Sequence, residues 1–252
     1  MKRLIFTSTC GLLLALSFAP ALRAQGGSPM LTDDTGTPGA GKWELTTAFT
    51  TERRSGERVS ELPAMEIKYG LGKRIELAYG LSYLGKSVDG EPRTTGLGNS
   101  VAGMKWRFYD AGEDGLLASV TPELEFNNPG SRSDERELVE HGTVIVLPFQ
   151  VQKVFGPVDV NVDFGREFTN SDDSWFGGLC VGHAIGEKVE LAAELHVATD
   201  EDVGRSALTA NVGIRIAVME NSELLIALGR ELHNHFEPKV TLLGYLGWNQ
   251  AF

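Results

Sequence analysis

Few side chains in this 252-residue sequence have the spacing that catalysis or metal binding requires. The five histidines are His141, His183, His196, His233 and His235. His233 and His235, in the stretch "HNH", resemble half of a metal site, but no third ligand is near them in the sequence, and zinc takes three or four protein ligands. A solvated loop accounts for them better. No Ser-His-Asp arrangement is visible either, so we predict neither an enzyme, nor a metal site, nor a cofactor.

The remaining chemistry resides in polar side chains that recur at every second position. In "MEIKYG", for example, Glu66 and Lys68 alternate with Met65, Ile67 and Tyr69. A spacing of two places such residues on one face of a β-strand. The titratable residues of this polar face are Glu66, Lys68, Glu76, Lys105, Arg107, Glu123, Glu125, Asp159, Asp163, Glu190, Glu194, His196 and Arg215. They either pair to fill an interior or line a solute path, and the two hypotheses are compatible.

Acids outnumber bases in this set, so an open path lined by it should disfavour anions. Lys105 and Arg107 lie one strand before Glu123 and Glu125, and we expect these two pairs to meet across a hairpin. His196, two residues after Glu194, is either a proton-linked group or a hydrogen-bonded structural one.

These residues must be positioned by β-strands, because the alternation continues from Lys42 almost to the C-terminus. The pattern predicts twelve strands, over Trp43–Thr51, Ala64–Gly70, Arg74–Leu84, Ser100–Asp110, Leu116–Asn127, Thr143–Phe155, Val158–Phe168, Trp175–Ile185, Val189–Thr199, Ser206–Val218, Leu224–Arg230 and Lys239–Trp248. Pro122 and Pro148 fall inside two of these strands and predict bulges, because proline cannot donate to a ladder.

The connections between the predicted strands alternate between short and long. Short ones such as "LGK", "GP" and "GEK" contain the residues of tight turns. Long ones such as "TERRSGERVSELP", "GKSVDGEPRTTGLGN" and "NPGSRSDERELVEHG" are charged. Outer-membrane barrels show this asymmetry, with short periplasmic turns, longer extracellular loops and an even number of strands.

The apolar residues at alternate positions of each strand could face the inside of a soluble barrel or the lipid around a membrane barrel. The polar parity is rich in glycine, alanine and serine, which suits a crowded interior. Aromatic residues gather near strand ends, as an interfacial girdle requires; these are Tyr69, Tyr83, Trp106, Phe108, Tyr109, Phe126, Phe155, Trp175, Tyr245 and Trp248. The sequence therefore predicts an all-β, twelve-stranded antiparallel up-and-down transmembrane barrel, with Leu77 and Tyr79 toward lipid.

The N-terminus predicts the compartment. Residues 1–24 combine Lys2 and Arg3 with a short apolar stretch and small residues, which is the pattern of a secretory signal peptide. We expect cleavage after Ala24, with Ala21 as the alternative. This leader contains three basic and no acidic residues, so its removal changes the formal net charge from −11 to −14. Such an acidic chain is a poor candidate for nucleic-acid binding.

The predicted organisation is a signal peptide over 1–24, an irregular lead-in over 25–41 that is rich in glycine and proline, and one barrel over 42–252 in the bacterial outer membrane. One cysteine, Cys180, remains in the mature chain. The chain ends in Phe252 after an amphipathic strand, which resembles the C-terminal signal of bacterial outer-membrane proteins.

Four stretches, "DDTGTPGAGKWELTTAF", "PAMEIKYGLGKRIELAYGLSY", "GLGNSVAGMKWRFYD" and "TPELEF", resemble the outer-membrane family named for the meta pathway of phenol degradation. The resemblance runs from about Asp33 to the C-terminus. It implies a barrel that takes up aromatic or other hydrophobic compounds, although no residue can be matched to a substrate.

The sequence thus predicts an outer-membrane channel for passive uptake of small solutes. The alternatives are a plugged barrel with a structural or partner-binding role, and a lipid-modifying barrel enzyme. The expected partners are outer-membrane lipid, an unidentified small solute and the barrel assembly machinery, which would read Phe252.

Overall fold

The computed structural model describes residues 27–112, 115–170, 172–236 and 238–252, so the predicted signal peptide lies outside the described residues. The strands are β1 (Trp43–Arg54), β2 (Glu57–Gly70), β3 (Ile75–Val88), β4 (Thr94–Leu97), β5 (Ser100–Asp110), β6 (Leu116–Val120), β7 (Glu123–Phe126), β8 (Thr143–Phe155), β9 (Val158–Phe168), β10 (Ser174–Ile185), β11 (Val189–Asp200), β12 (Ser206–Met219), β13 (Ser222–Asn234) and β14 (Leu242–Ala251). No helix in these ranges is long and apolar enough to cross a membrane.

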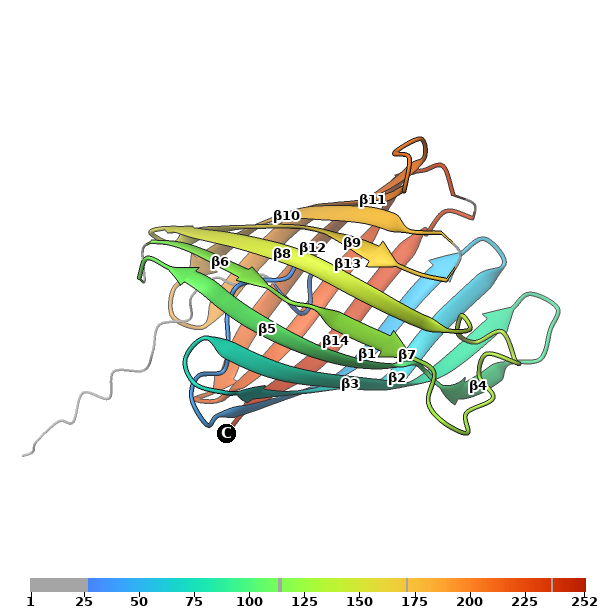
Figure 1. Cartoon of the computed structure of the whole chain (residues 1–252), viewed down its shortest axis with the longest axis horizontal. Coiled ribbons are helices and arrows are strands. Elements are labelled where there is room, and N and C mark those ends of the chain that lie inside the picture. The colour runs from blue at the N-terminus through green and yellow to red at the C-terminus, as the bar shows by residue number, and fades with distance from the viewer. Residues whose placement is uncertain (1–26, 113–114, 171, 237) are drawn as a thin grey trace, which may run out of the picture.

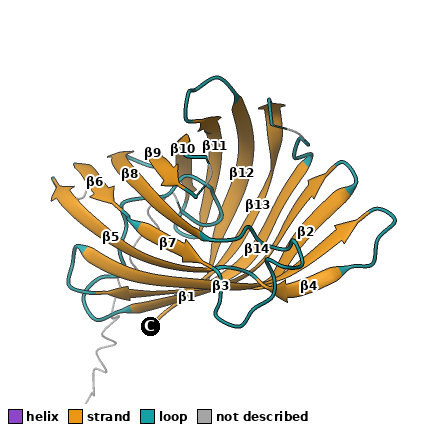
Figure 2. Cartoon of the chain, turned by 45° about the vertical axis from the view of Figure 1, so that its right-hand side comes forward, coloured by secondary structure: helices purple, strands orange, loops and turns teal. Residues whose placement is uncertain are grey.

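The strands pair antiparallel and close into a barrel (Figures 1 and 2). β1 pairs with β14 along the whole seam, from Glu44 opposite Ala251 to Arg53 opposite Leu242. β4 and β5 both pair with β3, and β6 and β7 both pair with β5 and β8. Each couple therefore acts as one interrupted strand, and the barrel has the twelve strands that the sequence predicted.

The two ends of the barrel differ. One end, on the left in Figure 1, carries the start of β1, the C-terminus and the turns β2–β3, β5–β6, β8–β9, β10–β11 and β12–β13; we call it the short-turn end. There the Phe252 N–H donates to the Trp43 carbonyl at 2.9 Å. The opposite, long-loop end carries β4 and the loop of residues 127–142.

Apolar side chains cover the outside of the barrel. Leu77 and Tyr79 are 42% and 43% exposed, whereas Glu76 is 3% exposed. On β9, Val162 and Phe164 are exposed while Asp159 and Asp163 are buried. A soluble protein buries its apolar set, so this inverted distribution is the one that lipid selects. The predicted orientation of Leu77 and Tyr79 is confirmed.

One aromatic assignment is wrong. Tyr245 packs against the buried cluster of Met30, Cys180 and Ala227 inside the barrel and lines the internal cavities, so it is not part of an outer girdle. Its neighbours Leu246 and Leu242 are the exposed residues of this strand. β14 therefore keeps the alternation, but with Tyr245 on the inner face.

Several predicted long connections are shorter than expected, because the strands continue past their predicted ends. β1 and β2 extend to a turn at Ser55 and Gly56, where Gly56 has φ +75° and supplies the left-handed conformation of a tight hairpin. β3 runs on to Val88 and β13 to Asn234. The hydrophobic pattern failed there because strands that project beyond the membrane no longer need an apolar face.

The two prolines lie diagonally across one gap in the ladder, with Pro122 opposite Leu147 and Pro148 opposite Thr121. Val120 pairs with Phe149 and Glu123 with Val146, so the register between β6, β7 and β8 passes the gap unshifted. The predicted bulge at Pro148 is wrong, since its register with β9 is also continuous. The bulge lies instead on β5, between Trp106 and Tyr109.

Candidate functional site: the barrel lumen and its N-terminal segment

Residues Gly27–Lys42, the plug segment, start inside the barrel and leave it at the short-turn end, where Ala40, Gly41 and Lys42 are exposed (blue in Figure 1). Thr32 and Thr35 have no exposed surface, and Met30 is 7% exposed. The sequence indicated only that this stretch is irregular. It has no strand alternation because it is surrounded by side chains of the wall instead of lying in the sheet.

The plug segment is a loop whose tip points toward the long-loop end. The Met30 N–H donates to the Gly27 carbonyl at 2.9 Å, and the Gly27 N–H donates to the Thr32 carbonyl at 2.8 Å, which closes the turn at the tip. At the other end of the segment, the Gly41 N–H donates to the Gly70 carbonyl at 2.8 Å beside a short turn. The segment is therefore tied to the wall at its exit and reaches into the lumen before β1 begins.

Acidic side chains of the wall accept hydrogen bonds from the backbone of the plug segment. The Glu194 carboxylate accepts from the N–H groups of Leu31 and Thr32, at 2.9 and 2.8 Å. Asp163 accepts from the N–H of Asp33 at 3.1 Å. Buried backbone donors need such partners, and a carboxylate is a stronger acceptor than a neutral group.

Basic side chains hold the segment from other directions. Lys105, only 2% exposed, lies 2.9 Å from the Asp33 carboxylate and 3.5 Å from that of Asp34. The Arg215 guanidinium donates to the carbonyls of Gly27 and Ser28, both at 2.8 Å, and its Nη1 lies 3.6 Å from Glu190. Opposite charges of wall and segment thus neutralise each other in the lumen.

Small residues of the wall make room for the segment. A Cβ on Gly178 would lie 2.2 Å from the Thr32 hydroxyl, and a Cβ on Gly213 would lie 2.0 Å from the Met30 terminal methyl. The Met30 side chain packs against Cys180 and Ala227. The weak alternation of "WFGGLCVGHAI" therefore has a cause, because Gly178 and Cys180 are inner-face residues that must be small.

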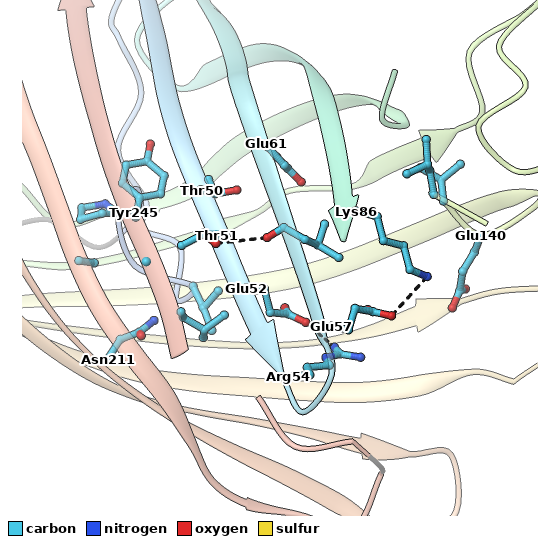
Figure 3. A pocket seen from close by; sticks show the side chains of 18 of the residues that line it. Thr50, Thr51, Glu52, Arg54, Glu57, Glu61, Lys86, Glu140, Asn211 and Tyr245 are labelled. Atoms are coloured by element: carbon cyan, nitrogen blue, oxygen red, sulfur yellow. Dashed lines mark hydrogen bonds and ion pairs between the residues drawn. The ribbon is translucent and has the colours of Figure 1, made fainter. Parts of the chain in front are cut away.

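Two connected cavities lie between the tip of the plug segment and the long-loop end. They enclose about 630 and 810 Å³ and share Val59, Glu61 and Tyr245; we call them together the vestibule. Pro29 and Leu31 of the plug segment form its floor. Figure 3 shows polar and charged side chains of β1 and β2 pointing into it.

The vestibule is amphipathic and acidic. In its 630 Å³ part the apolar lining includes Leu138, Val139, Leu243 and the Tyr245 ring. The acids there are Glu52, Glu57, Glu61, Asp134, Glu137 and Glu140, whereas the bases are Arg54 and Lys86. Both bases are engaged, Arg54 with Glu52 at 2.6 Å and Lys86 with Glu57 at 3.4 Å (Figure 3).

The loop of residues 127–142 folds over the mouth of the vestibule. Its residues Leu138, Val139 and Glu140 line both cavities. The Lys86 ammonium donates to the Glu137 carbonyl at 3.2 Å, and Arg136 donates to the Thr95 carbonyl at 2.9 Å. A short pocket of about 90 Å³, lined mainly by polar residues, lies below the plug segment on the short-turn side.

All thirteen predicted lumen residues are buried or half-buried. Five of them contact the plug segment directly, namely Lys105, Arg107, Asp163, Glu194 and Arg215. Glu66, Lys68 and Glu76 gather at the pocket below it, where Lys68 lies 3.2 Å from Glu66 and 3.8 Å from Glu76.

The other five lie elsewhere on the inner wall. Glu125 lines the vestibule and accepts a hydrogen bond from Asn99 at 2.8 Å. Asp159 accepts a hydrogen bond from Asn161, and Glu190 lies beside Arg215. The Glu123 side chain lies over Gly103, where a Cβ would be 3.2 Å from its Cγ. The His196 ring stacks on Phe176 at 6.0 Å, which fits a structural group.

The predicted cross-strand pairs of Lys105 and Arg107 with Glu123 and Glu125 are wrong. The register sets Glu123 opposite Gly103 and Glu125 opposite Val101. Lys105 binds Asp33 instead, and Arg107 lies 3.2 Å from Asp110 and donates to the Lys73 carbonyl at 2.7 Å. Sequence reasoning missed the plug segment itself, and its nearest signal was "TDDTG", acids that follow the leader without a strand to carry them.

The histidines at the long-loop end form a close pair. The Nε2 atoms of His233 and His235 lie 2.9 Å apart, and His235 also accepts from the Ser206 N–H at 3.2 Å. Within the described ranges no three His, Cys, Asp or Glu side chains are grouped to hold a metal ion.

No protein-family model matches the sequence, and no curated protein matches it significantly. Several solved structures share its fold. An outer membrane channel from Pseudomonas putida F1 has a TM-score of 0.68 at 17% identity, over 87% of this chain and 98% of that one.

Two porins are also similar. The NanC porin has a TM-score of 0.59 at 7% identity, over 82% of this chain and 98% of that one. The KdgM porin, solved in complex with disordered oligogalacturonate, has a TM-score of 0.51 at 13% identity, over 82% and 99%. At these identities the likeness concerns the fold alone: this chain has the fold of outer-membrane β-barrel channels.

Proposed function

We propose that this protein is an outer-membrane channel for passive uptake of small amphipathic solutes, in which the plug segment closes the lumen. The observation that carries the proposal is the vestibule, a wide internal space whose floor is Pro29 and Leu31 of the plug segment. Side chains hold that segment, whereas strand pairing holds the wall, so it can leave the lumen without opening the barrel.

The chemistry of the vestibule supports a class of solute. Leucine, valine and tyrosine side chains lie beside carboxylates there, so a molecule with an apolar body and a polar or cationic group fits best. Aromatic compounds belong to this class, in agreement with the resemblance to the meta-pathway family. Because carboxylates predominate over bases, anions should pass less readily than cations.

The N-terminal leader and the C-terminal phenylalanine support a location in the outer membrane. Cleavage of the signal peptide after Ala24 would deliver the chain to the periplasm, and the assembly machinery would read Phe252, whose side chain is 67% exposed. The short-turn end then faces the periplasm and the long-loop end faces the outside. We assign the protein no catalytic role, since among the described residues no third Asp, Glu, Cys or His side chain joins the His233–His235 pair.

A reversible cross-link tests the channel. Thr32→Cys and Gly178→Cys, in a Cys180→Ala background, place two thiols where the Thr32 Cβ lies 3.1 Å from an ideal Cβ at 178, within a small adjustment of disulfide geometry. Liposome swelling would be measured with aromatic acids, aromatic amines and sugars, oxidised and reduced.

We expect swelling to fall on oxidation and to return with reductant. A reduced protein that passes none of these solutes would support the alternative, a permanently plugged barrel. Equal swelling in both states would show that solutes bypass the plug segment. The single variants Thr32→Cys and Gly178→Cys are the matched controls and should ignore the oxidant, and Gly178→Cys shows how much swelling comes from crowding of Thr32 alone.

A further inference from the structure

A groove of about 430 Å³ runs over the outer face of β1, β2 and β3 toward the long-loop end. Its upper part is lined by Arg53, Arg58 and Arg93, and no acidic side chain lines it. Below them lie Phe49, Leu62, Tyr83 and Leu242.

Two of these arginines face each other directly. Arg53 and Arg58 are cross-strand partners in the β1–β2 ladder, and both side chains are exposed. Like charges in this position repel each other and destabilise a strand pair. An anion between them would remove that repulsion.

The third arginine is brought to the same place by a glycine. The Arg93 guanidinium lies over Gly85 of β3, so that a Cβ there would be 2.3 Å from its Nη2. Gly85 is the cross-strand partner of Ser60, which also lines the groove. The guanidinium thus rests on the sheet at the groove instead of extending into solvent.

The carboxylates of the described residues form no ion pair with these arginines. Glu52 and Glu57, their neighbours in sequence, point into the vestibule and pair with Arg54 and Lys86. Within the described part of the chain, no carboxylate lies within 4.0 Å of Arg53, Arg58 or Arg93. The strand alternation itself enforces this, because residues one position apart lie on opposite faces.

The groove lies at the height of a lipid headgroup. Arg53 is ten positions from Trp43 on β1, and Arg58 is eleven from Tyr69 on β2, and both aromatic residues lie at the short-turn end. At ~3.3 Å per residue and a strand tilt of ~40°, ten positions rise by about 25 Å, the height of the apolar band of such barrels.

We propose that this groove binds a phosphate-bearing glycolipid of the outer leaflet, of the lipid A type. Guanidinium groups bind phosphate through paired hydrogen bonds, and three of them match a headgroup with more than one phosphate. An acyl chain then lies along Phe49, Leu62 and Leu242 in the bilayer. The inference rests on the proposed outer-membrane location but not on transport.

Binding would be measured by native mass spectrometry and by thermal unfolding of the purified barrel with diphosphoryl lipid A. We expect wild-type protein to retain the lipid in a salt-sensitive manner. The combined variant Arg53→Gln, Arg58→Gln and Arg93→Gln should bind at least ten-fold more weakly. The single variant Arg53→Gln should give a smaller loss and guards against a folding defect in the triple one.

Arg230→Gln is the matched control, since Arg230 is exposed on the outer face of β13 at the height of Leu242 but outside the groove. Unchanged lipid A binding by the triple variant would overturn the proposal. So would equal retention of inorganic pyrophosphate, which would show a simple anion patch, or of phosphatidylglycerol, which would remove the outer-leaflet preference. Liposome swelling by the triple variant should stay at the wild-type level, which separates this test from that of the channel.

Discussion

Glu194 is one of the main anchors of the plug segment. Its carboxylate accepts three hydrogen bonds, from the N–H groups of Leu31 and Thr32 and from the Asn211 amide at 2.7 Å. Glu194→Gln keeps the size of the side chain but replaces one acceptor oxygen by an NH2 group. The NH2 group would then face the N–H of Leu31 or Thr32, and because both groups are donors no hydrogen bond could form between them.

The cost can be worked out from these contacts. One buried N–H left without an acceptor costs ~1–3 kcal/mol, and the other bond to the plug segment loses the ~0.5–1 kcal/mol that an ionised acceptor adds. The sum is about 3 kcal/mol against the seated state. At about 1.4 kcal/mol per factor of ten, the population with a displaced plug segment should rise about 100-fold.

Thiol labelling measures that population. Thr32 has no exposed surface, so a cysteine there, in a Cys180→Ala background, reacts with a membrane-impermeant maleimide only when the segment has left the lumen. When reseating is faster than labelling, the labelling rate is proportional to the displaced population. We expect Glu194→Gln to raise the rate about 100-fold.

Glu125→Gln is the control, because Glu125 lies on the same inner wall but bonds to Asn99 and not to the plug segment. If Glu194→Gln labels no faster than Glu125→Gln in a folded barrel, the hydrogen bonds of Glu194 do not hold the segment and the reasoning fails.

Three further outcomes are expected. Lys105→Met removes the ammonium beside Asp33 and Asp34, so reversal potentials in planar bilayers should shift toward stronger cation selectivity; an unchanged potential would contradict the assigned charge balance. Gly213→Leu would overlap Met30 and should speed labelling of the cysteine at 32, whereas Gly177→Ala, whose Cβ meets nothing closer than 3.4 Å, should not. At the long-loop end, the hydrogen bond from His141 lowers the pKa of the Asp134 carboxyl. Their 2.7 Å contact should therefore persist above the ordinary carboxyl pKa of about 4 and be lost as the pH falls through the lowered pKa of Asp134. Hydrogen exchange of residues 131–137 would show this transition, and Asp134→Asn should abolish it.

The alternation of residues was sufficient to predict the barrel. Strands such as Thr143–Phe155 and Val158–Phe168 were predicted to the residue, because lipid on one side and a polar lumen on the other impose a period of two across the membrane. Prediction failed beyond the membrane, at Arg54, Val88 and Asn234, where that constraint ends.

The inner wall was predictable as a face but not as a set of contacts. Parity alone placed Lys105, Asp163, Glu194 and Arg215 inside. Their partners lie in a segment 72 to 188 residues away in the chain, and no local pattern encodes a contact at such separations. The girdle assignment of Tyr245 was wrong although alternation could have excluded it, since Tyr245 and Trp248 lie three positions apart on one strand and therefore on opposite faces.

The sequence by itself therefore determined the number of strands, the apolar exterior and the acidic character of the lumen, because each follows from side-chain alternation along one strand. Only the tertiary structure decided that residues 27–42 occupy the lumen, that glycines at 178 and 213 make space for them, and that three arginines from β1, β2 and the turn before β4 meet on the outside. Those features depend on closure of the barrel, which brings strands distant in sequence around a common interior and a common outer surface.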